Sequence, residues 1–219
     1  HSSDLFVLVS PASDWNVNLR QDRNYRSHLT GMESDTRVMF AYHYYDSIMT
    51  GFHGLGFHDH KREEYVDAHR LGVRGAQDKQ MVPFLTEFGT RQNWFRTVVR
   101  RHMNWQFEAV EAAAVHATYW NVNLYNTFAA HDGFMKEDFS LLGPYDHASA
   151  LPQARNLDIA TRPYVVAASA EPEFMHFNLR TKEFVLTLRG RPVPEPTVLY
   201  LPATARHPMQ PVHYPDGFV

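Results

Sequence analysis

Residues 81–89, MVPFLTEFG, place a carboxylate directly after a run of apolar side chains and directly before an aromatic residue and a glycine. A short apolar run of this kind is typical of a strand buried on both faces, as strands are in a parallel sheet. An ionised carboxylate at the end of such a strand costs free energy unless it has hydrogen-bonding partners or a chemical role. Glu87 is therefore the most informative residue of the chain, although on its own it fits a structural glutamate bonded to loop amides equally well.

Similar apolar stretches precede and follow this one along the chain. Residues 38–45, VMFAYHYY, and residues 115–122, VHATYWNV, each predict a strand that ends in polar or aromatic side chains, and residues 5–9, LFVLV, predict an earlier strand. A mostly solvated helix at 61–71 and a second helix at 94–114 lie between them. Strands separated by helices in this order pair in parallel through crossover connections.

The strand ends carry the chemistry in this pattern, as they do on the active-site face of a (β/α)8 barrel. Four strands in about 120 residues amount to half of such a barrel, because eight strands need roughly 250 residues. Beyond Pro163 the period changes to two, as in residues 184–189, which indicates short antiparallel strands. We therefore predict an α/β chain with half of a (β/α)8 barrel at 1–160 and a small antiparallel β-sandwich at 161–219.

The composition excludes several classes of protein. The chain has no cysteine, which excludes a disulfide scaffold, a thiolate zinc site and a cysteine nucleophile. Its formal net charge of −3 offers no basic surface of the kind that nucleic acids require. The longest apolar runs, such as residues 164–168, are far too short to cross a bilayer.

A histidine-rich loop raises the question of a metal site. His53, His58 and His60 lie close together beside Asp59, and imidazole and carboxylate groups are common metal ligands. The glycines among them favour a solvated loop near the active site. We therefore expect no metal.

Three side chains complete a candidate active site around Glu87. His43 and Tyr45 end the preceding strand and Trp120 ends the following one, so the tips of adjacent parallel strands bring them together. A retaining glycosidase uses one ionised carboxylate as nucleophile and a second carboxylic acid to protonate the leaving oxygen. Tyr45 can donate a hydrogen bond to Glu87, His43 can bind a sugar hydroxyl or orient Tyr45, and Trp120 offers a flat face for a sugar ring. Packing explains each residue alone, but the group favours glycoside cleavage.

The sequence around these residues resembles glycoside hydrolase family 5, in clan A of the retaining β-glycosidases. The stretches that match its sixth, seventh and eighth barrel strands are FAYHYYD (40–46), VPFLTEFG (82–89) and ATYWNVNLYN (117–126). Later stretches are similar to the endoglycoceramidase and glucosylceramidase branch: HDGFMKEDFSLLGP (131–144), RPYVVAASAEPEFMHFN (162–178), PTVLYLP (196–202) and HYPDGF (213–218). Members of that branch carry a C-terminal β-sandwich behind the barrel.

The resemblance implies a retaining enzyme that hydrolyses a β-glycoside attached to a lipid, such as a glycosylceramide or a steryl glycoside. It makes Glu87 the nucleophile, Tyr45 its hydrogen-bond partner, His43 part of the sugar site and Trp120 the platform of the −1 sugar. It implies no metal or organic cofactor. Three apolar residues of the histidine-rich loop fit a rim for the lipid: Phe52, Leu55 and Phe57.

The family's acid/base glutamate is absent from this chain. In the family it lies in an Asn-Glu-Pro motif at the end of the fourth strand, and no Asn-Glu pair occurs in these 219 residues. Residues 5–9 then correspond to the fifth strand, and the chain to the C-terminal half of the enzyme. Its opening, without an initiator methionine or a basic leader, likewise indicates a cleaved or truncated product. Glu137 and Asp138 follow the last predicted barrel strand, and we interpret them as capping or structural residues.

We expect the chain to act with the N-terminal half of the same enzyme, either joined to it or as a separate chain. Half a barrel leaves two strand edges open, so the isolated chain is expected to aggregate, dimerise or need that half. A glycolipid substrate implies contact with a membrane surface and favours a secreted or membrane-associated location over a cytoplasmic one. No nucleic-acid partner is expected. Two alternatives stay open: a family 5 polysaccharide hydrolase of the β-glucanase type, and a non-catalytic carbohydrate- or lipid-binding fragment.

Overall fold

The computed structural model describes residues 7–9, 38–46, 62–133, 137–144 and 153–202. Within them the elements are β1 (Val7–Val9), β2 (Val38–Tyr44), α2 (Arg62–Gln77), β3 (Val82–Phe88), α3 (Arg96–Ala113), β4 (His116–Tyr119), α4 (Leu157–Ala160), β5 (Tyr164–Ala167), β6 (Glu171–Phe177), β7 (Phe184–Arg189) and β8 (Val198–Tyr200). The predicted alternation of strands and helices is confirmed, although α2 runs beyond residue 71 and β4 is shorter than 115–122. None of the helices in these ranges combines the length and apolar character of a membrane span.

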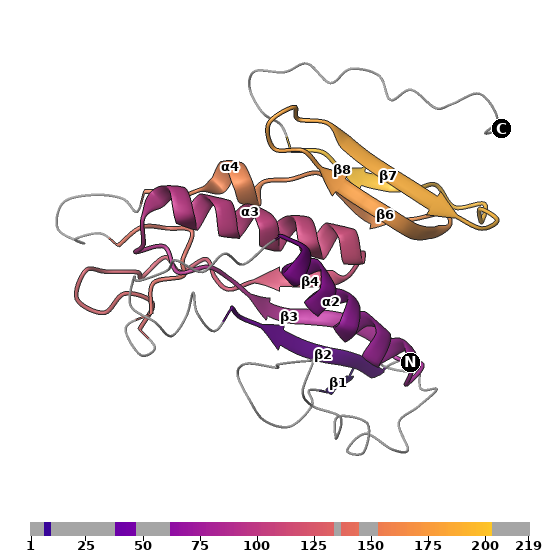
Figure 1. The fold of residues 1–219 in the computed structure, drawn as a ribbon, viewed down its shortest axis with the longest axis horizontal. Helices are drawn as coiled ribbons and strands as arrows, with labels where there is room; N and C mark the ends of the chain where they lie inside the picture. The colour runs from indigo at the N-terminus through magenta and orange to yellow at the C-terminus, as the bar shows by residue number, and fades with distance from the viewer. Residues whose placement is uncertain (1–6, 10–37, 47–61, 134–136, 145–152, 203–219) are drawn as a thin grey trace, which may run out of the picture.

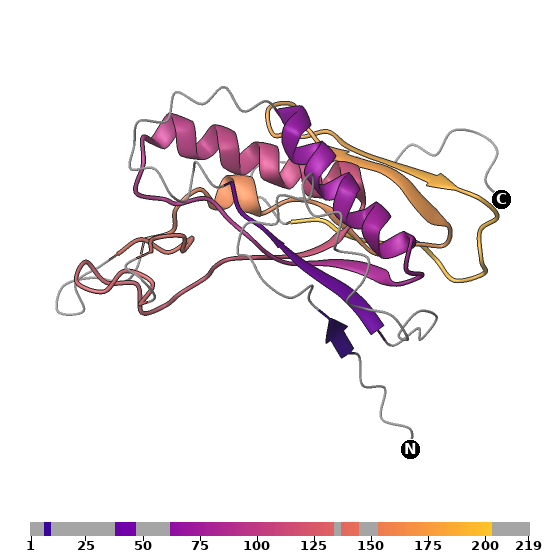
Figure 2. The same ribbon diagram turned by 60° about the horizontal axis from the view of Figure 1, so that its bottom comes forward.

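The first four strands form one parallel sheet, in the order in which they occur along the chain. The connection between β2 and β3 contains α2, and the connection between β3 and β4 contains α3. Figures 1 and 2 both show the two helices on the same face of this sheet. Parallel strands covered by crossover helices are the arrangement of a partial (β/α)8 barrel, as predicted.

The main core lies between the sheet and the two helices. Its buried side chains are Val38, Phe40, Tyr42, Leu85, Phe88 and Val115 from the sheet and its borders, with Ala76 and Met81 from the end of α2 and the turn after it. A close approach of α2 to the sheet occurs at Gly72, where a Cβ would lie 2.8 Å from Cζ of the Tyr42 ring. A glycine at this position lets the helix lie directly against that buried ring.

The remaining strands form two separate two-stranded antiparallel sheets, β5 with β8 and β6 with β7. Along β7 half-buried and exposed residues alternate, which matches the period of two in the sequence. Figure 1 shows α3 between the parallel sheet and the strands β6 and β7. The helix therefore packs on both parts of the molecule.

A buried ion pair joins α3 to β6. Arg162 donates from Nε to Oε1 of Glu111 at 2.5 Å and from Nη2 to the carbonyl of Phe177 at 2.8 Å. The other oxygen of Glu111 accepts the backbone N–H of Phe177 at 2.9 Å. Because both charges are paired and hydrogen-bonded, these interactions offset the free-energy cost of removing the charges from water. It ties the antiparallel strands to the helix that supports the parallel sheet.

Candidate active site

Glu87 lies near the carboxyl end of β3, which pairs with β2 on one side and β4 on the other. Leu85 and Phe88 are buried in the core, whereas the side chain of Glu87 keeps 25% of its surface exposed. The sheet therefore holds the backbone of Glu87 in place while its carboxylate reaches a partly open space.

Both polar residues at the end of β2 contact this carboxylate. Tyr45 Oη donates to Oε2 of Glu87 at 3.0 Å, and Nδ1 of His43 lies 3.3 Å from the same oxygen. The register between β2 and β3 shifts between Tyr42 and His43, and the shift sets His43 opposite Glu87. No described residue donates a hydrogen bond to Oε1. The two contacts therefore fix Oε2 alone.

Tyr45 is held as a protonated hydrogen-bond donor. Its ring packs edge-on against Phe139, with the ring centroids 5.6 Å apart. Burial, followed by the negative charge of Glu87, raises the pKa of Tyr45 far above its ordinary value. The phenol therefore keeps its proton well beyond neutral pH and offers it to Glu87.

A buried chain of hydrogen bonds anchors the end of β2 to both helices. Asp46, next to Tyr45, accepts a hydrogen bond from Tyr65 Oη of α2 at 2.6 Å, and the same hydroxyl lies 2.7 Å from Nδ1 of His102 on α3. All three polar side chains are buried. Sequence reasoning misses this set because it treats the first part of α2 as mostly solvated. The aspartate directly after the strand-end tyrosines is the signal that points to it.

Trp120 directly follows β4. Its backbone N–H donates to the carbonyl of Phe88 at 2.8 Å, which fixes the residue beside the end of β3. Its side chain is half-buried, and the peptide bond to Asn121 is cis. The chain passes so close to Gly89 that a Cβ there would lie 2.3 Å from the carbonyl oxygen of Trp120. Glycine is therefore required at the point where the two strand ends meet.

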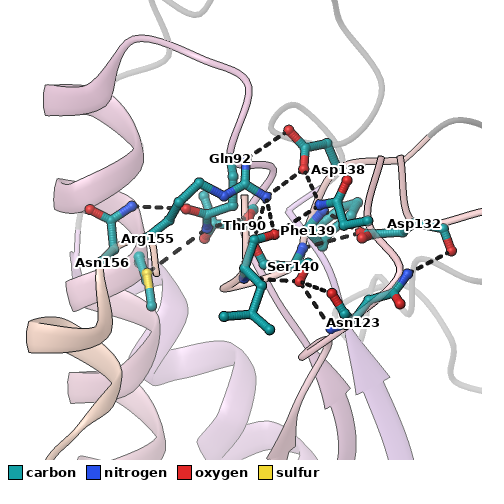
Figure 3. Close-up of polar contacts among 12 residues, drawn as sticks. Thr90, Gln92, Asn123, Asp132, Asp138, Phe139, Ser140, Arg155 and Asn156 are labelled. Atoms are coloured by element: carbon teal, nitrogen blue, oxygen red, sulfur yellow. Dashed lines mark hydrogen bonds and ion pairs between the residues drawn. The ribbon is translucent and has the colours of Figure 1, made fainter. Parts of the chain in front are cut away.

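Buried and half-buried side chains fix the loop that follows β3. Gln106 of α3 donates to the carbonyl of Gly89 at 3.1 Å and accepts a hydrogen bond from Thr90 Oγ1 at 2.9 Å. Gln92 donates to the carbonyl of Thr90 at 2.9 Å, and Figure 3 shows Asn156 bonded to the same glutamine. These contacts hold the turn that follows Glu87.

Asp138 belongs to a structural network, as Figure 3 shows. Arg155 donates to its two oxygens at 2.9 and 2.5 Å, and Asn126 donates to one of them at 3.0 Å. Burial alone would raise the pKa of Asp138, but the hydrogen bonds from Arg155 and Asn126 hold that pKa below its ordinary value. These contacts agree with its interpretation as a structural residue.

Glu137 differs from its neighbour in its surroundings. Partial burial raises the pKa of Glu137, Arg91 counteracts this, and the charges of Asp132 and Glu87 raise it further. Its carbonyl accepts the N–H of Asp132 at 2.8 Å. The interpretation of Glu137 as a capping or structural residue leaves out this electrostatic link to Glu87.

Several sequence-based candidates lie outside the described residues: Phe52, His53, Leu55, Phe57, His58, Asp59 and His60. In the part of the chain that the structure describes, no three His, Asp or Glu side chains form a potential metal site. The expected apolar rim and the expected lack of a metal in this loop stay predictions.

Comparison with known proteins identifies the fold. No model of a protein family matches the chain, and no curated protein matches it. Sterylglucosidase 1 from Cryptococcus neoformans is 16% identical over 76% of this chain and 31% of its own, with a TM-score of 0.61. Endo-glycoceramidase II from Rhodococcus sp. is 16% identical over 90% of this chain and 40% of its own, with a TM-score of 0.55. The chain thus spans less than half of either glycosidase and has the fold of that part, a partial (β/α)8 barrel.

Proposed function

We propose that this chain is the half of a retaining β-glycosidase that carries the nucleophile, and that Glu87 is that nucleophile. The pair of contacts on one oxygen of Glu87 carries the proposal: Tyr45 at 3.0 Å and His43 at 3.3 Å. A carboxylate held at Oε2 keeps its orientation, which favours attack by Oε1 on a bound sugar. The position at the carboxyl ends of parallel strands supports the same conclusion.

The proposed reaction is a double displacement. Oε1 of Glu87 bonds to the anomeric carbon while the bond to the aglycone oxygen breaks, and a carboxylic acid gives that oxygen its proton. The same acid group, then ionised, takes a proton from water, whose oxygen displaces Glu87 and releases the sugar with retained configuration. Tyr45 keeps Oε2 hydrogen-bonded in both steps. We assign ring stacking to Trp120 and hydroxyl binding to His43.

We assign the acid/base carboxylate to an N-terminal half that supplies four further strands. No Asn-Glu pair occurs in this chain. Among the described residues, β1 and β4 each pair with one strand, and four more strands between their open edges would close an eight-stranded barrel. In this proposal β1 to β4 are the fifth to eighth strands of a family 5 barrel, and the antiparallel strands belong to a C-terminal β-sandwich.

A lipid-linked β-glycoside is the substrate class that we propose. The two matched structures are a sterylglucosidase and an endo-glycoceramidase, and the second was also solved as a lactosyl-enzyme intermediate. A covalent sugar–enzyme species is what attack by Glu87 would form. The polysaccharide hydrolase and the non-catalytic binding fragment are the alternatives that the experiment must separate.

The test uses this chain together with its N-terminal half, and a 2-deoxy-2-fluoro β-glucoside with a good leaving group, which traps the glycosyl-enzyme. We expect labelling of Glu87, located by peptide mass mapping, and none in Glu87→Gln. Glu183→Gln, an exposed glutamate beside β7, is the matched control and should label normally. Label on another residue contradicts the assignment of Glu87. Sugar binding without turnover, unchanged in Glu87→Gln, identifies a binding fragment instead.

A second measurement defines the substrate class. Glucosylceramide in detergent and a soluble β-glucan are compared at equal concentrations of hydrolysable bonds. Preferential hydrolysis of the lipid-linked substrate supports the proposal. Preferential hydrolysis of the glucan supports the polysaccharide alternative.

A further inference from the structure

The segment that begins at Glu137 crosses between the two loops that border the candidate site. The N–H of Gln92, in the loop after β3, donates to the carbonyl of Asp138 at 2.6 Å. The N–H of Asp132, in the loop after β4, donates to the carbonyl of Glu137 at 2.8 Å. The backbone at Glu137 is therefore fixed relative to both strand ends.

The same segment packs directly on the partner of Glu87. The ring of Phe139 lies edge-on to Tyr45, and its Cδ1 is 3.1 Å from the position that a Cβ on Gly89 would take. Phe139 thus covers the hydroxyl-bearing ring on one side and the turn after β3 on the other. Glu137 comes two residues before Phe139, and its charge acts on both Tyr45 and Glu87, so its carboxylate lies in the neighbourhood of this pair.

Three carboxylates in this region, those of Asp132, Glu137 and Asp138, differ in their hydrogen-bond partners. Asp138 is paired with an arginine, and Asp132 accepts two backbone N–H groups at 2.6 and 3.1 Å. No described residue donates a hydrogen bond to the carboxylate of Glu137, which is half-buried. Partial burial raises the pKa of Glu137, Arg91 offsets part of this, and the charges of Asp132 and Glu87 raise the pKa further. The fold therefore gains little from an ionised group at this position.

We infer that Glu137 is a substrate-binding residue whose carboxylate accepts hydrogen bonds from hydroxyl groups of the sugar that Glu87 attacks. The inference rests on the proposed function. A sugar hydroxyl supplies the donor that the described residues do not provide, and an ionised acceptor forms a stronger hydrogen bond than a neutral one. A half-buried carboxylate near the nucleophile that receives no hydrogen bond from the described residues is better explained by a role in function than by a role in stability.

The experiment compares Glu137→Gln and Glu137→Asp in the assembled enzyme with two aryl β-glucosides, one with a good and one with a poor leaving group. We expect kcat/KM to fall roughly 10–100-fold in Glu137→Gln, equally for both substrates, because a hydrogen bond to a charged group is lost. Glu137→Asp should recover part of the activity. A loss confined to the poor leaving group and rescued by azide identifies a general acid and overturns the inference, as does unchanged activity.

Monodeoxy aryl glucosides distinguish a direct contact with the sugar from a structural role, because a purely structural residue would not change the effect of removing one particular hydroxyl. In the parent enzyme the analogue without the contacted hydroxyl should react more slowly, and in Glu137→Gln the same deletion should cost little more. Equal penalties in both proteins contradict the inference. Fluorosugar labelling of Glu87 in Glu137→Gln separates the two proposals, since slow labelling at Glu87 preserves the assignment of the nucleophile whatever the deoxy series gives.

Thermal stability supplies the control for folding. Because the fold disfavours the ionised carboxylate of Glu137, the melting temperature of Glu137→Gln at neutral pH should equal or exceed that of the parent. Glu183→Gln should leave both activity and melting temperature unchanged. A clear fall in melting temperature together with lost activity, without recovery in Glu137→Asp, would assign Glu137 a structural role.

Discussion

Tyr45 is the residue whose hydroxyl and ring can be tested separately. The hydroxyl donates to Glu87, whereas the ring packs against Phe139. Tyr45→Phe removes only the hydroxyl, so kcat/KM should fall roughly 10–100-fold, since a hydrogen bond to a charged group contributes about 1.5–3 kcal/mol. The melting temperature should change little because the ring stays in place. Steady-state kinetics with an aryl β-glycoside and a thermal melt make the test. A large loss of stability with little loss of activity would contradict it.

At this scale the sequence predicts which strand ends converge but not how they meet. The pattern of strand ends brings Tyr45 and His43 to Glu87, and the structure has both contacts, while the catalytic roles stay predictions. His43 lies opposite Glu87 because the register shifts between Tyr42 and His43. A run of apolar residues carries no signal for such a shift, since the shift depends on the neighbouring strand.

The helix α2 is the element in which packing overrides the sequence pattern. Its charged and polar residues predict a mostly solvated helix, yet Tyr65 and His69 are fully buried. Their polar atoms meet partners that come from other elements, Asp46 for Tyr65 and Tyr42 for His69. Such partners are distant in sequence, so no reading of α2 alone finds them.

Burial of His69 predicts a loss of stability in acid. Burial lowers the pKa of His69 to about 3, from an ordinary value of about 6.5 in the unfolded chain. The neutral ring is favoured in the fold, so the contribution is complete above pH ~6.5 and declines as the pH falls towards 3. Between pH ~6.5 and ~5 this group should remove about 2 kcal/mol from the free energy of unfolding.

Urea unfolding at those two pH values measures the effect. His69→Gln has no charge to gain in the unfolded state, so its stability should depend less on pH by about 2 kcal/mol. The same pH dependence in parent and variant would mean that His69 does not carry it.

At the scale of the whole molecule, the Glu111–Arg162 pair connects the antiparallel strands to α3. Arg162→Met leaves a buried carboxylate without its cation and should lower the free energy of unfolding by about 3–5 kcal/mol. Arg162→Met with Glu111→Leu replaces both charges by apolar groups and should recover most of that loss. Denaturant unfolding of the assembled protein measures both variants. A double variant no more stable than the single one would show that the pair contributes through something other than its charges.

The order of strands and helices can be predicted from the sequence more directly than the structure of the irregular segments between them. The strands of the parallel sheet are recognisable because each is a short run of mostly apolar residues, and β7 because its residues alternate. The irregular chain after β4 shows no such period. Its order comes from single contacts, such as those of Arg155 with Asp138 and Ser140, which no local pattern encodes.

Gly89 limits how the end of β3 can vary. The carbonyl oxygen of Trp120 occupies the space that any larger residue would need, so the junction of the two strand ends is closed to variation. Under the proposed function, we expect a change of sugar preference to come from the bordering loops, where side chains can change without moving the backbone. A randomised library for altered substrate preference would accordingly leave residue 89 fixed and vary the segment around Glu137.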